Sequence, residues 1–161
     1  MKRLSIAVAV GAAILRSGLA VAQPAVIPRI GQAPHSAGET FRKLKEYLSD
    51  EAASQFHLLS ADSKSGIIVA KRSGIDTRTW SEWAFCKMSP SHLLDSLDDG
   101  SVTLRIKVDR SGKHSSYVRV DADFEGTYGG LGSNQNTQQC VSNGVLEQNI
   151  LATAGAAPSG T

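Results

Sequence analysis

VTLRIKVD at residues 102–109 and VRVDADFE at residues 118–125 are the two stretches that decide the fold. In each of them an apolar side chain alternates with a polar one, which is the period of a β-strand that buries one face and leaves the other in water. Two such strands joined by a short polar segment predict a hairpin in an antiparallel sheet that is covered on one side only.

The charges on the polar side of this hairpin predict its register. One register sets Lys107 opposite Asp121, and another, shifted by two residues, sets Lys107 opposite Arg119. Opposite charges across a strand pair contribute roughly 0.2–1 kcal/mol each, whereas like charges oppose pairing. We therefore expect the first register, with Arg105 opposite Asp123 and with the acidic residues of the second strand salt-bridged on the solvated face.

Upstream of the hairpin the sequence predicts one helix and three strands. The helix is indicated by the capping box SAGE and by apolar residues that recur with a helical period after it. The strands are indicated by alternation and by flanking turn residues. In chain order we expect a helix beginning at residues 36–39, strands at residues 56–61, 67–71 and 79–86, and a turn at residues 98–100.

Downstream of the hairpin a glycine-rich loop leads to a predicted C-terminal helix. Asn136 or Thr137 provides the N-cap, and apolar residues then form one broad stripe up to a stop at Gly155. This places Cys140 in the first turn of the helix, with Glu147 facing away from the apolar stripe.

Together these elements predict an α+β domain. Its antiparallel sheet has about five strands, and the N-terminal and C-terminal helices pack on one face of that sheet in a two-layer arrangement. One apolar sheet face and two amphipathic helices are enough to close a single core.

The N-terminal segment predicts export, and the remaining sequence predicts one domain. Residues 1–22 combine a positive start, an apolar run too short to span a bilayer, and the small residues Ala-Val-Ala, which is the pattern of a signal peptide cleaved after Ala22. The proline-punctuated residues 23–35 predict an extended leader, residues 36–155 the single domain, and residues 156–161 a disordered tail. We expect a periplasmic or secreted protein.

Composition limits the possible partners. The hydrophobic content of 41% and the charged content of 20% are ordinary for a globular domain. The net charge of +2 includes Lys2, Arg3 and Arg16, which all lie in the signal segment. Removing these three cations leaves about −1, so the basic balance of a nucleic-acid-binding protein is absent from the mature chain.

The two cysteines, Cys86 and Cys140, both lie beyond the cleavage point. In an oxidising compartment they predict one structural disulfide, which would join the third strand to the last helix. The alternative is a reactive thiol at Cys140, activated by the start of a helix. No cysteine is placed for N-terminal lipidation, so we expect no stable membrane insertion.

No pattern in the sequence indicates catalysis, a metal or a cofactor. A Gly-x-Ser-x-Gly elbow and a Ser-x-x-Lys motif are both absent. Asp121, Asp123 and Glu125 share one strand face and could serve as acid–base groups or cation ligands, but a salt-bridged sheet face explains them. The histidines lack the spacing of metal ligands; they are His35, His57, His92 and His114.

Trp80 and Trp83 are the strongest candidates for an interaction site. On a strand, residues three apart point to opposite faces, so one indole would fill the core and the other would face a partner. The alternative is that both pack against the protein itself.

Two segments carry a resemblance to known exported proteins: WAFC at residues 83–86 and CVSNGVLE at residues 140–147. The second is similar to a pattern in small exported bacterial proteins of unassigned activity. With the order of elements, the chain resembles the helix-grip domains of accessory lipoproteins of the outer-membrane β-barrel assembly machine. The resemblance implies a helix-grip-like fold and no functional residue, and this chain lacks the lipid-attachment cysteine.

Three functional hypotheses follow. The first is a non-catalytic exported factor that binds a protein or an envelope component through its uncovered sheet face and the Trp80/Trp83 segment. The second is a small ligand-binding or hydrolytic domain, with a pocket under the C-terminal helix near a loop lid at residues 126–136. The third is an inhibitor or immunity-type protein of an envelope enzyme.

Overall fold

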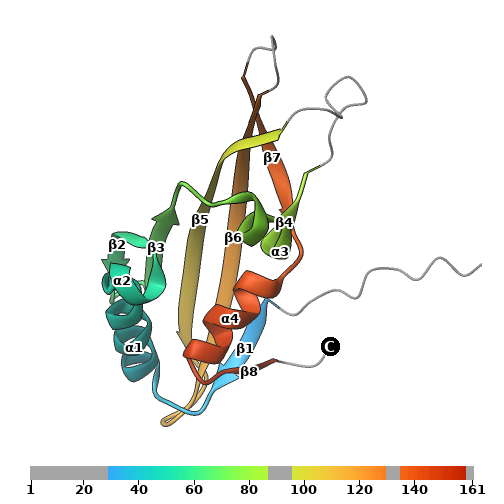
Figure 1. Ribbon diagram of the computed structural model, residues 1–161. Coiled ribbons are helices and arrows are strands. Elements are labelled where there is room, and N and C mark those ends of the chain that lie inside the picture. The colour runs from blue at the N-terminus through green and yellow to red at the C-terminus, as the bar shows by residue number, and fades with distance from the viewer. Residues whose placement is uncertain (1–28, 87–95, 130–134, 159–161) are drawn as a thin grey trace, which may run out of the picture.

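The computed structural model describes residues 29–86, 96–129 and 135–158. In chain order its elements are β1 (Ile30–Ala33), α1 (Ala37–Ser49), α2 (Glu51–Ser54), β2 (His57–Asp62), β3 (Ile67–Arg72), α3 (Thr77–Trp83), β4 (Ala84–Phe85), β5 (Ser96–Arg110), β6 (Ser116–Gly129), β7 (Asn136–Ser142), α4 (Val145–Thr153) and β8 (Ala157–Pro158) (Figure 1). The expected signal peptide and part of the expected glycine-rich loop lie outside the described residues.

The long strands β5 and β6 form the centre of the sheet (Figure 1). β3 and then β2 continue it beyond β5, while β1 and β7 share the other edge of β6, along residues 116–119 and 124–128 respectively. β8 pairs with β1, and β4 pairs with β7. In the described part of the chain, seven strands thus form a continuous antiparallel sheet and β4 adds an eighth, where the sequence predicted about five. β4 and β8 have two residues each, too few to show a period.

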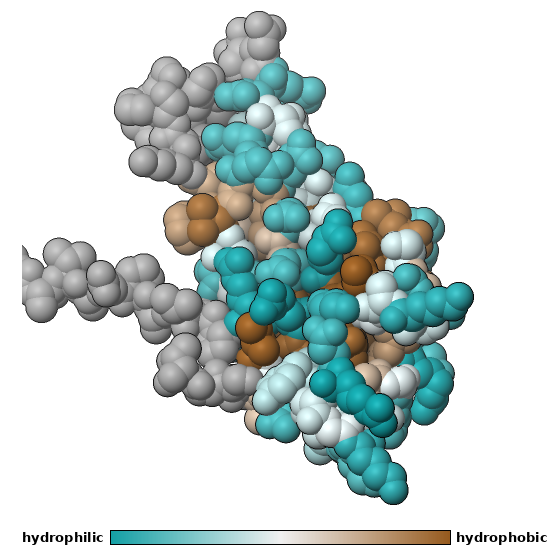
Figure 2. Space-filling view, turned by 180° about the vertical axis from the view of Figure 1, so that it is seen from behind, coloured by the Kyte–Doolittle hydropathy of each residue, from teal (hydrophilic) through white to brown (hydrophobic). Residues whose placement is uncertain are grey.

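One face of the sheet carries the core. The even-numbered residues from Val102 to Val108 on β5 and from Val118 to Phe124 on β6 are buried, as the alternation predicted. α1, α3 and α4 lie against this face and add Leu44, Trp80, Ile150 and their apolar neighbours to the same cluster (Figure 1). The opposite face, seen in Figure 2, is mostly hydrophilic, with separate apolar patches.

The register of the central hairpin differs from the predicted one. Lys107 lies opposite Arg119, and Arg105 lies opposite Asp121. Both registers keep the apolar side chains together, because a shift by two residues leaves every side chain on its own face. Packing of the core therefore does not choose between them.

The connection at the end of the hairpin explains the observed register. The N–H groups of Ser111 and Gly112 both donate to the carbonyl oxygen of Ser115, at 3.2 and 3.1 Å. Lys107 finds its anion along its own strand, where its Nζ lies 3.1 Å from Oδ1 of Asp109. Backbone hydrogen bonds worth about 1 kcal/mol each outweigh exposed ion pairs, which contribute roughly 0–1 kcal/mol.

The predicted third strand is a helix over most of its length. α3 begins after Asp76, whose Oδ1 accepts the Thr79 N–H at 3.0 Å and whose Oδ2 accepts the Thr79 hydroxyl at 2.7 Å. An Asp three residues before the group that it caps is a helix-start signal, and here it overrides the strand preference of the aromatic residues.

The predicted C-terminal helix begins later than expected. The first part of the predicted helix is the strand β7, and α4 starts only at Val145. Gly144, directly before it, has a φ of 88°, and the Val145 N–H donates to Oδ1 of Asn143 at 3.1 Å. Pairing with β6 gives the backbone of residues 136–140 its hydrogen-bond partners, and this long-range pairing wins over the local helical stripe.

Both expected irregular ends contribute strands. Residues 30–33 of the predicted leader form β1, and residues 157–158 of the predicted disordered tail form β8. A Cβ added at Gly31 would lie 2.9 Å from the carbonyl oxygen of Ala157, so the glycine permits this close approach. The domain therefore extends beyond the predicted limits at both ends.

Gly100 gives a test of the packing between α3 and the sheet. It lies inside β5, just after a bulge, where the sequence predicted a turn, and an added Cβ would come within 2.6 Å of the Trp80 ring. We predict that Gly100→Ala lowers the free energy of unfolding by about 1–3 kcal/mol through overpacking.

Gly38→Ala is the matched control for this prediction, measured by the same urea titration. Gly38 lies in α1 and nothing surrounds its added Cβ within 4 Å, so alanine should stabilise the protein by about 0.5–1 kcal/mol. Equal effects of the two variants would contradict the packing described here.

Candidate functional site

The disulfide joins two neighbouring strands rather than a strand and a helix. Cys86 directly follows β4 and Cys140 lies in β7, with the sulfurs 1.97 Å apart and the Cα atoms 4.4 Å apart. The pairs Ala84–Ser142 and Phe85–Val141 precede it in the same ladder. The predicted pairing of cysteines is present, but the predicted helical partner is wrong because residues 136–142 are a strand.

Tyr128 supports the disulfide from β6. Its hydroxyl donates to Sγ of Cys86 at 2.8 Å. Burial raises the pKa of Tyr128 above its usual value, so the phenol stays protonated and remains a donor. β4, β7 and β6 are therefore tied together on the core side of this edge.

Trp80 and Trp83 do not point to opposite faces, because residues three apart on a helix lie on the same side. Trp80 is in the core, 4% exposed, and meets Phe124 edge to face with ring centroids 5.5 Å apart. Trp83 is half-buried, and Cζ of Arg72 lies 5.0 Å from its ring centroid. With Trp80 in the core, Trp83 is the tryptophan left for a partner, and it is partly covered by the protein's own arginine.

The exposed aromatic side chain of this segment is instead Phe85. It is 59% exposed, and its strand partner Val141 is 51% exposed. Gln139 pairs with Glu125, so Val141, two residues further along β7, lies on the same uncovered sheet face as Glu125. Phe85 and Val141 therefore form an apolar pair at the margin of the mostly hydrophilic face seen in Figure 2. The sequence analysis missed this pair because β4 was hidden in a predicted longer strand.

A row of carboxylates runs along β6 beside this pair. Asp121, Asp123 and Glu125 share the uncovered face, and within the described ranges none of them has a basic nitrogen within 4 Å. The observed register sets Asp123 opposite Thr103 instead of Arg105. Asp121 has Arg105 opposite it, but the two form no ion pair, so the predicted ion pairs of the two aspartates are wrong. We call Asp121, Asp123 and Glu125 the acidic row.

Glu147 is a buried acid that the sequence analysis placed outside. It is fully buried in the first turn of α4, where Oε2 accepts the Ser142 hydroxyl at 2.8 Å and Oε1 lies 3.7 Å from Nε of Arg29. It joins the end of β7 to the residue before β1. No pattern distinguished it from the exposed acids of other helices.

Histidines do not gather at one place. His35 lies 2.9 Å from Nζ of Lys43, His57 lies 2.7 Å from Glu51, and His114 is exposed in the hairpin loop. His92 lies outside the described residues. No group of three metal-ligating side chains occurs in the described ranges.

Among the cavities lined by described residues, two lie away from α4. One of about 330 Å³ opens beside β2, β3 and α2, and one of about 240 Å³ opens between the start of α1 and the β2–β3 turn. The predicted pocket under the C-terminal helix corresponds to neither of them.

Fold and site together define an α+β domain with a disulfide-tied edge and one open sheet face. No family model matches the chain, and no curated protein does so either. Among solved structures, a DUF4468 family protein from Bacteroides ovatus is similar with a TM-score of 0.34 and 17% identity, covering 69% of this chain and 58% of the other. The chain thus spans less than two thirds of that protein. The helix-grip resemblance stays a prediction.

The disulfide is tested by removing both sulfurs. Its cysteines are separated by 54 residues, and closing such a loop is worth about 4 kcal/mol in the chain-entropy model. We predict that Cys86→Ser/Cys140→Ser lowers the free energy of unfolding, measured by urea titration, by up to this amount. Reductant should lower the free energy of unfolding of the wild-type protein only. Coinciding unfolding curves for wild type and variant without reductant would contradict it.

Proposed function

We propose that this protein is an exported, non-catalytic binding factor whose uncovered sheet face docks onto a partner protein. The carrying observation is the apolar pair Phe85–Val141, since both side chains are more than half exposed and lie next to each other on a mostly hydrophilic face. Large exposed apolar side chains held next to each other are typical of contact sites.

The backbone under the pair supports this proposal. The disulfide follows the pair in the ladder, and the Tyr128 hydroxyl holds Cys86 from the neighbouring strand. A rigid anchor loses little conformational entropy when a partner binds, which favours affinity.

The acidic row supplies the complementary chemistry. Gln139 pairs with Glu125, and Val141 lies two residues further along β7 on the same face. The carboxylates of Glu125 and Asp123 therefore lie alongside the apolar pair. Because no described basic residue lies within ion-pair distance, these carboxylates are available to an outside cation. The partner surface that fits combines an apolar residue with lysine or arginine side chains.

Export is supported by the signal-like residues 1–22 and by the disulfide, which persists in oxidising compartments. No helix among the described residues is long and apolar enough to cross a membrane. The periplasm or the extracellular space is the proposed location. An inhibitor or immunity-type role would use the same surface, with an enzyme as the partner.

Photo-crosslinking tests this proposal in cells that produce the protein. A photo-reactive residue at position 85 should give a discrete adduct, whereas one at position 117 should not. Tyr117 is the matched control because it is 47% exposed on the same face but lies at the other end of β6.

We predict that Phe85→Ala weakens binding of the crosslinked partner at least tenfold, about 1.4 kcal/mol or more. Tyr117→Ala should leave binding unchanged, and both variants should unfold within about 0.5 kcal/mol of wild type because the residues are exposed. Asp123→Asn/Glu125→Gln should reduce the salt dependence of binding. Equal loss in the Phe85 and Tyr117 variants, or loss in neither, would overturn the proposal.

A further inference from the structure

A second site lies where β2 and β3 meet α2. The cavity there has a volume of about 330 Å³, at the lower end of the range of small-molecule sites. We infer that it binds a small carboxylate that carries an apolar group. This inference is independent of the docking surface proposed above.

The cationic part of the site comes from the last two residues of β3, Lys71 and Arg72. Both are half-buried and line the cavity, and within the described ranges neither has a carboxylate within 4 Å. Arg72 is held over the Trp83 ring at 5.0 Å. Stacking on an aromatic face leaves the edge of a guanidinium free, and that edge donates two parallel hydrogen bonds to a carboxylate.

The acid that lines the cavity does not compete for these cations. Oε1 of Glu51 lies 2.7 Å from Nδ1 of His57 instead. Lys71 and Arg72 outnumber Glu51 among the charged residues that line the cavity, so the lining attracts an incoming anion.

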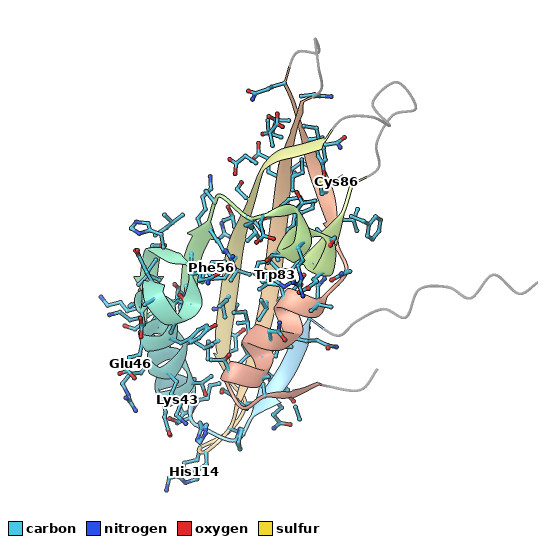
Figure 3. All side chains as sticks on the ribbon, in the orientation of Figure 1. Lys43, Glu46, Phe56, Trp83, Cys86 and His114 are labelled. Atoms are coloured by element: carbon cyan, nitrogen blue, oxygen red, sulfur yellow. A yellow bond between two sulfur atoms is a disulfide. The ribbon has the colours of Figure 1, made fainter. Side chains whose placement is uncertain are left out.

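The apolar part of the site comes from Phe56 and Leu59. Phe56 is only 2% exposed, whereas Leu59 is 52% exposed. Leu59 occupies the register shift of β2, between the pairs of Leu58 and Ser60 with β3, and this bulge accounts for its outward position. Figure 3 labels Phe56, which directly precedes β2, and Trp83, the last residue of α3.

The backbone around the cavity is irregular twice. Besides the bulge at Leu59, Gln55 has a φ of 59°, the one positive value among non-glycine residues in the described ranges, and it also lines the cavity. Gln55 is the C-cap of α2, and helices commonly end on a left-handed residue. The end of α2 and the bulge of β2 thus shape the same cavity.

The test uses the processed protein and two carboxylates with an apolar group, octanoate and the peptide Ala-Ala-Leu with a free C-terminus. Binding is measured by calorimetry and by amide shifts of residues 55–59 and 71–73, and Trp83 fluorescence reports on the change in charge at the guanidinium that lies over its ring. We expect saturable binding of one or both probes at millimolar concentrations or below, and none of octylamine. The probe that binds better distinguishes a free acid from a peptide terminus.

Variants separate the two halves of the site. Arg72→Gln should lower the affinity of the better-binding probe at least tenfold, about 1.4 kcal/mol. Leu59→Ser should lower that affinity several-fold while leaving the weaker binding of acetate unchanged. Lys64→Gln, which lines the other cavity, is the control and should bind as wild type does. The inference would be overturned if neither probe bound saturably or if octylamine bound as tightly as the carboxylates. Equal affinity of Arg72→Gln and the wild-type protein would overturn it too.

Discussion

Burial of one face of the β5–β6 hairpin is the constraint on which the rest of the structure depends. The two strands are the longest in the described chain, and their even-numbered side chains require an apolar cover. α1, α3 and α4 provide that cover from one side. Because all three helices are used on the same face, the odd-numbered side chains stay in water and form an open surface.

The second consequence is the divided edge of β6. β1 occupies its first residues and β7 its last, so segments from opposite ends of the chain complete one side of a single strand. Glu147 joins these segments from α4 through Ser142 and Arg29. The disulfide closes the outer side of β7 by fixing the very short β4. The backbone at Phe85 is thus held in place, although the side chain is exposed.

The two proposed sites lie toward opposite sides of the sheet and differ in their chemistry. The edge at β4 and β7 offers an apolar pair beside unpaired carboxylates, which suits a basic partner. The edge at β2 and β3 offers unpaired cations beside a leucine and a phenylalanine, which suits a small apolar acid. In both places the charged groups lack a counterion among the residues that the structure describes, so an external group can supply one.

Local patterns in the sequence determined the amphipathic strands, the N-terminal helix with its Ser36 cap and the β2–β3 hairpin, because each depends on neighbouring residues. The pairing of the cysteines followed from there being only two of them in the sequence. Only the tertiary structure decided the hairpin register, the strand at residues 136–142 and the burial of Glu147. These depend on backbone partners and charges that are distant along the chain, and two-residue strands such as β4 carry no period of their own. The exposed Phe85 and the cavity at Arg72 emerge only where those distant segments meet.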